Sequence, residues 1–339
     1  MPPLPATVPI ALVHGMLAGV RARGKPCDAC LADAGIPPAL LAEAGARVTA
    51  TQYIALYRAL IERLDDESLG FLSRPLKRGS FALMARSALG AADLETAMRR
   101  VARTFRLVQD DVLVEPVRDG GLAGLALRFL SPATARPAFL DEMLLRVFWR
   151  LFAWLAGGQL PAARFDFAFA CPPHIESYDK VFPAPVRFGL PQSACWFDAA
   201  RLQSPVRRDE AALRVFLADA QAHIILPRRG EESASARVRA HLQATQPAWS
   251  DLAATAAALH MAPSTLQRRL AGEGTSFQAL KDELRRDLAI ERLHTSTVAL
   301  AALAQELGFT DSAAFQRAFK GWTGSPPGAY RRTAGHTAT

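Results

Sequence analysis

Cysteine is scarce in this sequence, which has only Cys27, Cys30, Cys171 and Cys195 among 339 residues. So small a number excludes the disulfide framework of a small secreted domain. Only Cys27 and Cys30 are close together, as a Cys-x-x-Cys pair, and two interpretations are open for them. They could carry redox or zinc chemistry, or they could be two small residues on a short helix. The second interpretation is the commoner one, so we expect no metal site.

Long apolar runs are missing as well. No uninterrupted run reaches the roughly 18 residues that a membrane-spanning helix needs. The first twenty residues contain no Lys, Arg, Asp or Glu, yet no positive charge precedes their apolar stretch, which argues against a secretion signal. Ile10, Val13, Leu17 and Val20 recur at helical spacing and predict an amphipathic first helix. We expect a cytoplasmic, nucleoid-associated protein with no membrane partner.

The motifs of several common enzyme classes are also absent. The sequence contains no Gly-x-Ser-x-Gly, no glycine-rich phosphate loop and no His-Glu-x-x-His. The sequence therefore predicts a protein that is not an enzyme, with no catalytic residue and no cofactor.

Basic residues are in excess, with 40 Lys and Arg against 32 Asp and Glu and a net charge of +8. This balance suits a partner with a phosphate backbone, although many basic proteins bind no nucleic acid. A chain of 339 residues is long for one core and predicts two domains. The abundance of Ala, Leu and Arg beside only 4 Tyr favours helices.

A polar segment at 226–235, Leu-Pro-Arg-Arg-Gly-Glu-Glu-Ser-Ala-Ser, is the best linker candidate because it combines Pro, Gly and charge. Residues 1–225 before it mix helical and strand patterns and predict an α+β domain. The main patterns are helices at 51–64, 92–107 and 139–155 and strands at 112–117, 122–129, 165–169, 186–188 and 195–197. Asp119-Gly120-Gly121 favours a hairpin between the first two strands. Residues 236–332 show helical patterns only, and 333–339 are expected to form a flexible tail.

A two-helix unit occurs twice in the C-terminal part. Its apolar stripe at i, i+4 and i+7 recurs 48 residues later, at Leu252, Ala256 and Leu259 and again at Leu300, Ala304 and Leu307. The second helix recurs as 266–270 (Leu-Gln-Arg-Arg-Leu) and 315–319 (Phe-Gln-Arg-Ala-Phe). Ser250 and Pro263 predict the helix starts of the first unit, and Gly308 permits the turn of the second. The order of short helix, tight turn and short helix is typical of a helix-turn-helix.

The second helix of such a unit can enter the major groove, where Gln can pair with adenine and Arg with guanine. A solvated polar face would explain one copy of the Gln-Arg pair, but two copies in register favour DNA binding. Between the units, 276–293 predicts a helix with a capping box at Thr275 and Gln278, which would hold the recognition helices about 34 Å apart. The surrounding 236–332 carries 12 Lys and Arg against 8 Asp and Glu. The expected phosphate contacts are Arg285, Arg286, Lys320, Arg331 and Arg332.

The second unit contains 307–320 (Leu-Gly-Phe-Thr-Asp-Ser-Ala-Ala-Phe-Gln-Arg-Ala-Phe-Lys), followed by Trp322-Thr323-Gly324, Pro327 and Tyr330-Arg331. With 266–270, Gly274 and Ser276-Phe277 upstream, these residues resemble the signature of the AraC/XylS family of bacterial transcription regulators. The sequence departs from it at Ala299 and Pro326, where the family usually has Ser. Carried over by position, the resemblance implies that the first recognition helix presents Ser264, Gln267 and Arg268 to bases. The second would present Ser312, Ala313, Gln316 and Arg317.

The resemblance implies a sequence-specific, ligand-responsive transcription regulator, which we expect to be an activator. Its expected partners are promoter or operator DNA, RNA polymerase, a small-molecule effector and a second copy of the chain. The second copy would join through the N-terminal domain or its last helix. Residues 182–189 and the preceding 171–174 also resemble a family subgroup whose sensor is an α+β domain rather than a β-barrel.

An effector pocket should be mostly apolar with a few polar groups. Candidates gather on the predicted helix 139–155 and the strand after it; they are Arg146, Phe148, Trp149, Arg150, Phe152 and Phe167. The alternative interpretation is a packed aromatic core. An arginine in such a pocket would suit a carboxylate ligand, for example an amino acid or a fatty acid.

Two other functions stay open. The helix-turn-helix domain could be joined to a cysteine-based alkyl-transfer module for DNA repair, with Cys27 and Cys30 as the hint. One tightly bound zinc per chain would favour that function. The chain could also bind DNA independently of any ligand, and a metabolite that raises the melting temperature would argue against that.

Overall fold

The computed structural model describes residues 7–130, 137–158, 160–172, 175, 178–218 and 234–331. Contacts between Cα atoms divide the chain into two units. The helical unit comprises Met1–Ile10, Leu31–Tyr53 and Arg229–Thr339, and the sheet unit comprises Ala11–Cys30 and Ile54–Arg228. Most of the predicted linker (226–233) and the predicted tail lie outside the described residues, so the predicted domain boundaries stay predictions. No sequence pattern predicted that 31–53 would group with the C-terminal helices.

The sheet unit contains an open sheet, not a barrel. Its strands are β3 Val112–Asp119, β4 Leu122–Phe129, β5 Arg164–Asp166, β6 Val186–Arg187 and β7 Ser193–Asp198, in the order β3-β4-β7-β5-β6. Neighbouring strands are antiparallel except for the parallel pair β5–β6. The predicted hairpin is confirmed, with Gly120 at φ +56° in its turn. The predicted α+β fold without a barrel is thereby confirmed for this part of the chain.

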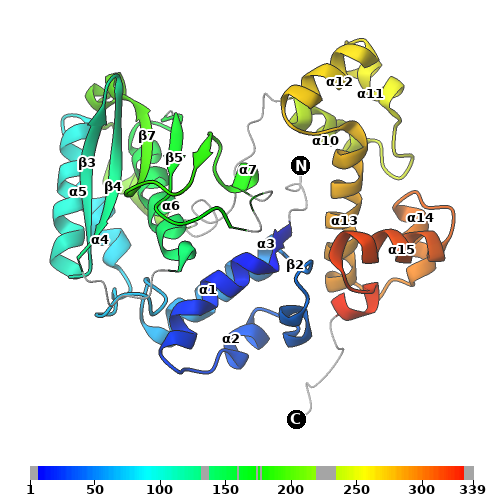
Figure 1. Cartoon of the computed structure of the whole chain (residues 1–339), viewed down its shortest axis with the longest axis horizontal. Helices are drawn as coiled ribbons and strands as arrows, with labels where there is room; N and C mark the ends of the chain where they lie inside the picture. Colours follow the sequence, from blue (N-terminus) through cyan, green and yellow to red (C-terminus); the bar gives the residue numbers. More distant parts are fainter. Residues whose placement is uncertain are drawn as a thin grey trace. The chain divides into compact units, whose positions relative to one another are not determined.

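Helices α5 Leu94–Val108 and α6 Ala138–Leu155 contact this sheet, and three other helices begin in one unit and end in the other. Those three are α1 Ile10–Ala22, α2 Asp28–Asp33 and α3 Ala50–Leu64. The sheet unit also contains α4 Ser80–Ser87, α7 Tyr178–Val181 and α8 Glu210–Ala218, with the short 3-10 helix η3 Ala199–Gln203. Figure 1 shows α5 beside β3 and β4.

Apolar periodicity explains why these helices form where they do. The predicted stripe on α1 is confirmed, since Val13, Leu17 and Val20 are buried. Helix α5 begins after Asp93, whose carboxylate accepts the Thr96 N–H, and it turns one apolar face inward. Helix α6 is apolar on nearly every side and is therefore buried on nearly every side.

The predicted strand 165–169 is wrong in its second half, because β5 ends at Asp166. Phe167 and Phe169 lie beyond the strand, in an aromatic cluster with Tyr178 and Phe188. The ring centroids of Phe167 and Phe169 are 4.9 Å apart. Residues two apart share a face in a strand as well, so the alternation of Phe165, Phe167 and Phe169 could not show where the strand ends.

The helical unit contains the two predicted helix pairs. Its helices are α10 Ala234–Ala244, α11 Leu252–Ala258, α12 Pro263–Gly272, α13 Phe277–Thr295, α14 Leu300–Glu306 and α15 Ser312–Thr323, followed by the 3-10 helix η4 Pro327–Tyr330. In Figure 1, α13 runs between the pair α11–α12 and the pair α14–α15. The strands β1 Thr7–Pro9 and β2 Arg47–Thr49 pair antiparallel in the same unit, together with the 3-10 helix η1 Pro38–Ala42.

Two predicted helix caps are off by one residue. Helix α11 is capped by Asp251, which accepts the Ala254 N–H, and not by Ser250. Helix α13 is capped by Ser276, and not by Thr275. Both predicted positions adjoin a second residue of capping type, and backbone geometry decides between such neighbours. Ala299 stands at the cap position of α14 without a side-chain hydrogen bond.

Candidate functional sites

The turns of the two helix pairs have the same backbone geometry. In the first, His260 N–H donates to the Ala257 carbonyl at 3.0 Å and Met261 N–H to that of Ala256 at 2.9 Å. In the second, 48 residues later, Gly308 N–H donates to Gln305 at 2.9 Å and Phe309 N–H to Ala304 at 2.9 Å. His260 and Gly308 also share a left-handed backbone, at φ +57° and +71°. The repeat predicted from sequence is therefore a repeat in structure.

Each pair turns the apolar residues of its second helix inward and its polar residues outward. Leu266 and Leu270 of α12 are buried, and so are Phe315 and Phe319 of α15. The predicted base-contacting residues lie on the outer faces: Ser264, Gln267, Arg268, Ala313, Gln316 and Arg317 are exposed, and Ser312 is half-buried. The Gln316 amide nitrogen donates to the Ser312 hydroxyl at 3.2 Å.

A stack of aromatic and basic groups joins the two pairs. The Arg285 guanidinium of α13 lies 5.1 Å from the Trp249 ring centroid and 5.0 Å from that of Phe309. The Trp249 indole N–H donates to the Glu306 carbonyl at 3.0 Å, and the Lys281 ammonium donates to the Trp249 carbonyl at 2.9 Å. Trp249 precedes the first pair and Glu306 ends the first helix of the second. Trp249 was not predicted as a functional residue, although a lone Trp directly before a helix cap is a sequence signal for such a contact.

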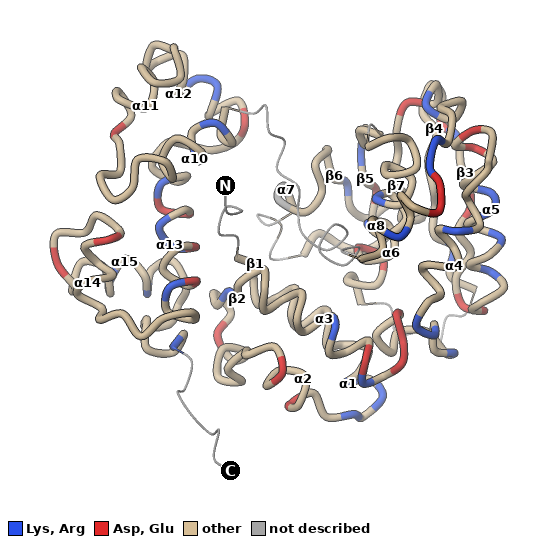
Figure 2. Tube along the Cα trace, turned by 180° about the vertical axis from the view of Figure 1, so that it is seen from behind, with Lys and Arg blue, Asp and Glu red and all other residues tan. Residues whose placement is uncertain are grey.

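The residues predicted to contact phosphate have different partners in the structure. Arg285 is engaged in this stack, where burial lowers the pKa of its guanidinium. Arg286 pairs with Asp287 at 3.0 Å and is 13% exposed. Arg331 donates to the Val298 carbonyl at 2.5 Å. Lys320 is exposed on α15, and Arg332 lies outside the described residues. Figure 2 shows basic positions on α12 and α13, with acidic positions interleaved along α13.

A cavity of about 340 Å³ lies within the sheet unit. Its walls come from α3, α4, α5, α6, α8 and the 67–78 loop; they are Tyr57, Arg58, Ile61, Glu62, Glu67, Ser68, Leu76, Arg78, Phe81, Ala82, Met84, Phe105, Met143, Leu144, Val147, Phe148 and Leu217. The volume falls in the range of small-molecule sites. Its wall is mainly apolar with a few polar groups, as a ligand pocket requires.

The loop that closes this cavity is held by two buried aspartates. Asp66 accepts the N–H groups of Ser68, Gly70 and Leu76 and the Ser68 hydroxyl. Asp111 accepts the Ser73 N–H at 2.5 Å and its hydroxyl at 2.8 Å.

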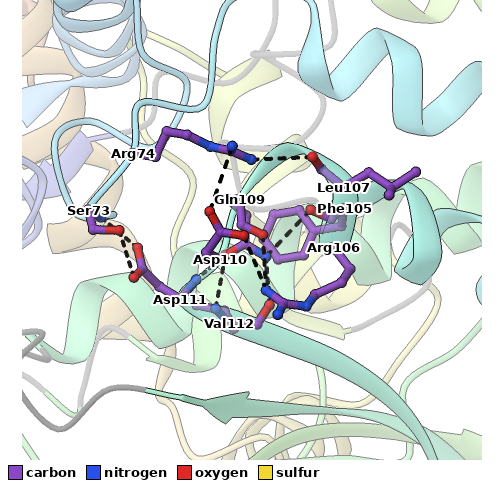
Figure 3. Close-up of polar contacts among 9 residues, drawn as sticks. All are labelled: Ser73, Arg74, Phe105, Arg106, Leu107, Gln109, Asp110, Asp111 and Val112. Atoms are coloured by element: carbon purple, nitrogen blue, oxygen red, sulfur yellow. Dashed lines mark hydrogen bonds and ion pairs between the residues drawn. The ribbon is translucent and has the colours of Figure 1, made fainter.

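Figure 3 shows the corner between α5 and β3 to which the loop is attached. There the buried Gln109 side chain accepts the Asp111 and Val112 N–H groups and donates to the Val112 carbonyl at 2.6 Å. Arg74 of the loop donates to the Leu107 carbonyl at 3.2 Å, so the loop is anchored to the helix that carries Phe105.

The predicted ligand residues are not brought together in this cavity. Phe148 lines it, and Phe152 packs on the Phe148 ring at 6.4 Å. Arg146 is buried on α6. Trp149 donates to the Leu160 carbonyl, and Arg150 lies over the Trp149 ring. Phe167 belongs to the aromatic cluster.

The five of these residues that lie on α6 contact different neighbours, and Phe167 lies outside that helix. Arg150 lines a separate pocket of about 490 Å³ with Trp154 and Arg208. Tyr57 and Glu67 were not predicted to line a ligand site, because no periodic pattern links α3 to the following loop.

The cysteine pair forms no metal centre with its described neighbours. Cys30 lies on α2 and Cys27 directly before it, both buried and neither joined in a disulfide, and burial raises the pKa of Cys27. Across the described residues, no three His, Cys, Asp or Glu side chains gather where they could hold a metal ion. No described helix has the length and apolar character needed to cross a bilayer.

Comparisons with known proteins define the class. Residues 24–206 match the family model of the arabinose-binding domain of the AraC transcription regulator, and 255–333 match a helix-turn-helix domain model. The chain belongs to the AraC family of transcription regulators, with an N-terminal ligand-binding domain and a C-terminal DNA-binding domain.

Individual relatives extend over nearly the whole chain. The ornithine utilization regulator of Pseudomonas aeruginosa is 28% identical over 326 residues, covering 96% of each chain. An HTH-type transcriptional regulator of Mycobacterium tuberculosis is 27% identical over 345 residues, covering 98% of each. Among solved structures, the transcriptional regulator CdpR from Pseudomonas aeruginosa is similar at 19% identity with a TM-score of 0.33, over 95% of this chain and 98% of that one.

Proposed function

We propose that this regulator places α12 and α15 in the major groove of promoter or operator DNA. The bases would be contacted by Ser264, Gln267 and Arg268 from α12 and by Ser312, Ala313, Gln316 and Arg317 from α15. The observation that carries this proposal is the structural repeat, in which two pairs with the same turn each expose a Gln-Arg face. Exposed Gln and Arg are suited to the adenine and guanine edges in the major groove.

Phosphate contacts would come from Lys320, Arg332 and the helix N-termini. Arg285, Arg286 and Arg331 were also expected to contact phosphate, but their guanidinium groups bind protein partners. We assign them instead to holding the helix pairs in place. The guanidinium of Arg285 would contribute to DNA binding by fixing the separation of the two faces.

The regulator would respond to a small molecule bound by its N-terminal domain. The name of the ornithine utilization regulator suggests amino acids and their amines as the first metabolites to screen. We further propose that the protein acts in the cytoplasm at the nucleoid, as a homodimer joined through the N-terminal domain, and activates promoters together with RNA polymerase. A dimer would double the DNA contacts of one chain.

The test of the DNA faces is a titration of operator and of unrelated DNA with three variants. Gln267→Ala and Arg268→Ala should each cost about 1–3 kcal/mol on the operator and much less on unrelated DNA. Arg269→Ala is the matched control, because it removes the same charge from a neighbouring exposed position with no expected base contact. Equal losses on both DNAs for Arg268→Ala would show that its role is electrostatic only.

A further inference from the structure

The Glu67 carboxylate lies in the wall of the cavity in the sheet unit. One carboxylate oxygen accepts the Gly79 N–H at 2.7 Å and the other accepts the Phe81 N–H at 2.7 Å. Burial raises the pKa of Glu67 more than these hydrogen bonds lower it, and the Asp66 charge raises it further. Each oxygen keeps a second lone pair that can accept another donor.

Arg58 and Arg78 line the same cavity, and the Arg78 guanidinium pairs with Asp65 at 3.3 Å. Among the described residues, no basic side chain forms an ion pair with Glu67, and the adjacent Asp66 is buried and acidic. The cavity beyond it is lined by Ile61, Phe81 and Met84. A half-buried carboxylate that already accepts two backbone N–H groups is stabilised further when a cation reaches it.

We propose that this cavity is the effector site and that its ligand has an apolar body and a protonated amine that ion-pairs with Glu67. This inference rests on the proposed control by an effector. The apolar body would lie against the α6 residues Met143, Leu144 and Phe148. The cation would remove the penalty of burying the carboxylate, so binding would favour the folded sheet unit. The arginines expected from sequence to hold a carboxylate ligand, Arg146 and Arg150, do not line this cavity, and Arg78, which does, pairs with Asp65.

The test uses the full chain and three probes of nearly equal size: phenylethylamine, phenylethanol and phenylacetate. Calorimetry at neutral pH should give an affinity for the amine about tenfold or more above that for the alcohol, with the carboxylate weakest. Glu67→Gln should abolish the preference for the amine, whereas Glu62→Gln, at an exposed position of the same wall, should preserve it. Ala82→Trp, which fills the cavity from α4, should remove binding of every probe.

The inference is overturned if no probe binds, if phenylacetate or phenylethanol binds as tightly as the amine, or if Ala82→Trp leaves binding unchanged. The melting temperature of each ligand-free variant shows whether it is folded. Operator binding by the same preparations separates the two questions. Loss of operator binding refutes the proposed function, whereas intact operator binding without a preference for the amine refutes only the ligand assignment.

A second inference comes from contacts at the start of α3. The buried Gln52 side chain donates to the Gly35 carbonyl at 2.6 Å and lies 3.3 Å from His294 Nδ1, near the end of α13. Its amide oxygen accepts the Thr49 N–H at 2.9 Å. These contacts attach the first turn of α3 to the helix that joins the two helix-turn-helix pairs.

The strand pair before α3 makes further contacts with the same region. Arg47 N–H of β2 donates to the Tyr330 hydroxyl at 3.0 Å, and the Thr7 hydroxyl of β1 donates to Asp287 of α13 at 2.6 Å. The Arg47 guanidinium donates to the Thr7 hydroxyl at 2.7 Å and so ties the strands together. Segments from the start of the chain are thus built into the helical unit.

The geometry points to α3 as the element through which the effector site acts on the DNA-binding helices. Tyr57, Arg58 and Ile61 of the same helix line the cavity, about one and a half to two and a half turns beyond Gln52. A helix transmits displacement because its turns are linked by hydrogen bonds. This inference also rests on effector control, but its evidence is the hydrogen bonding of Gln52 and not the chemistry of Glu67.

The test measures operator affinity with and without phenylethylamine. In the wild-type chain the amine should change operator affinity by about fivefold or more, a typical size for coupled sites. Gln52→Ala should bring that ratio close to one while leaving the affinity for the amine unchanged. Thr51→Ala, at an exposed position one residue away, is the control and should keep the wild-type ratio. A wild-type ratio of one, or a ratio that Gln52→Ala does not alter, overturns the inference.

Discussion

Adding a single methyl group at Gly308 should strongly destabilise the DNA-binding domain. Its backbone is left-handed at φ +71°, and a Cβ atom there would lie 2.8 Å from Trp249 Cδ1 and 3.1 Å from an Arg285 nitrogen. The left-handed conformation costs a residue with a Cβ about 1–2 kcal/mol. Overpacking against a fixed ring adds about 1–3 kcal/mol. Gly308→Ala should therefore destabilise the helical unit by about 2–5 kcal/mol, a large share of the stability of an ordinary domain.

The assay is urea unfolding of the full chain, followed through Trp fluorescence and far-ultraviolet circular dichroism, with operator affinity measured alongside. His260→Gly is the matched control, because His260 occupies the equivalent turn at φ +57°. There the relief of backbone strain is offset by the flexibility of glycine in the unfolded chain, so the change should stay within about 1 kcal/mol. If Gly308→Ala lowers stability by less than about 0.5 kcal/mol, the contact between Trp249 and the second turn does not exist as described.

Three further outcomes are expected. Ala299→Ser should raise the stability of the helical unit by about 0.5–1 kcal/mol in thermal unfolding, because α14 has no side-chain cap; no gain would mean that this helix start is satisfied in another way. Trp249→Phe should weaken operator binding because the indole hydrogen bond to Glu306 is lost, while circular dichroism should show that the helix pairs stay folded. Unchanged operator affinity would show that the stack does not position the two pairs. Binding of phenylethylamine should strengthen as pH rises above 4.5, because the pKa of Glu67 is raised and only its ionised form pairs with the amine; the Glu67→Gln variant should show a flat profile, and a flat wild-type profile would contradict the ion pair.

The helix-turn-helix repeat was predictable because its signal is local. An apolar stripe at i, i+4 and i+7 specifies the buried face of a short helix, and the polar residues between must then be outside. Leu266 and Leu270 are buried and Gln267 and Arg268 are exposed for this reason. Gly308 was also identified from the sequence, since the turn requires a left-handed residue.

What the sequence did not reveal depends on residues far apart in the chain. Arg285 carries the charge expected of a phosphate contact, but its partners Trp249 and Phe309 lie 36 and 24 residues away and convert it into part of a stack. The cavity draws its wall from five helices and a loop, and no periodic pattern connects them. Alternation at Phe165, Phe167 and Phe169 predicted a longer strand because aromatic residues suit strands and packed clusters equally.

Base-resolved footprinting of an operator by the 339-residue chain tests whether both helix pairs contact one duplex. We predict two protected stretches of major groove about 34 Å apart on one face of the duplex. Arg268→Ala should release contacts in one stretch only, and Arg317→Ala contacts in the other only. A single protected stretch, or the same bases released by both variants, would contradict the account of two faces acting together.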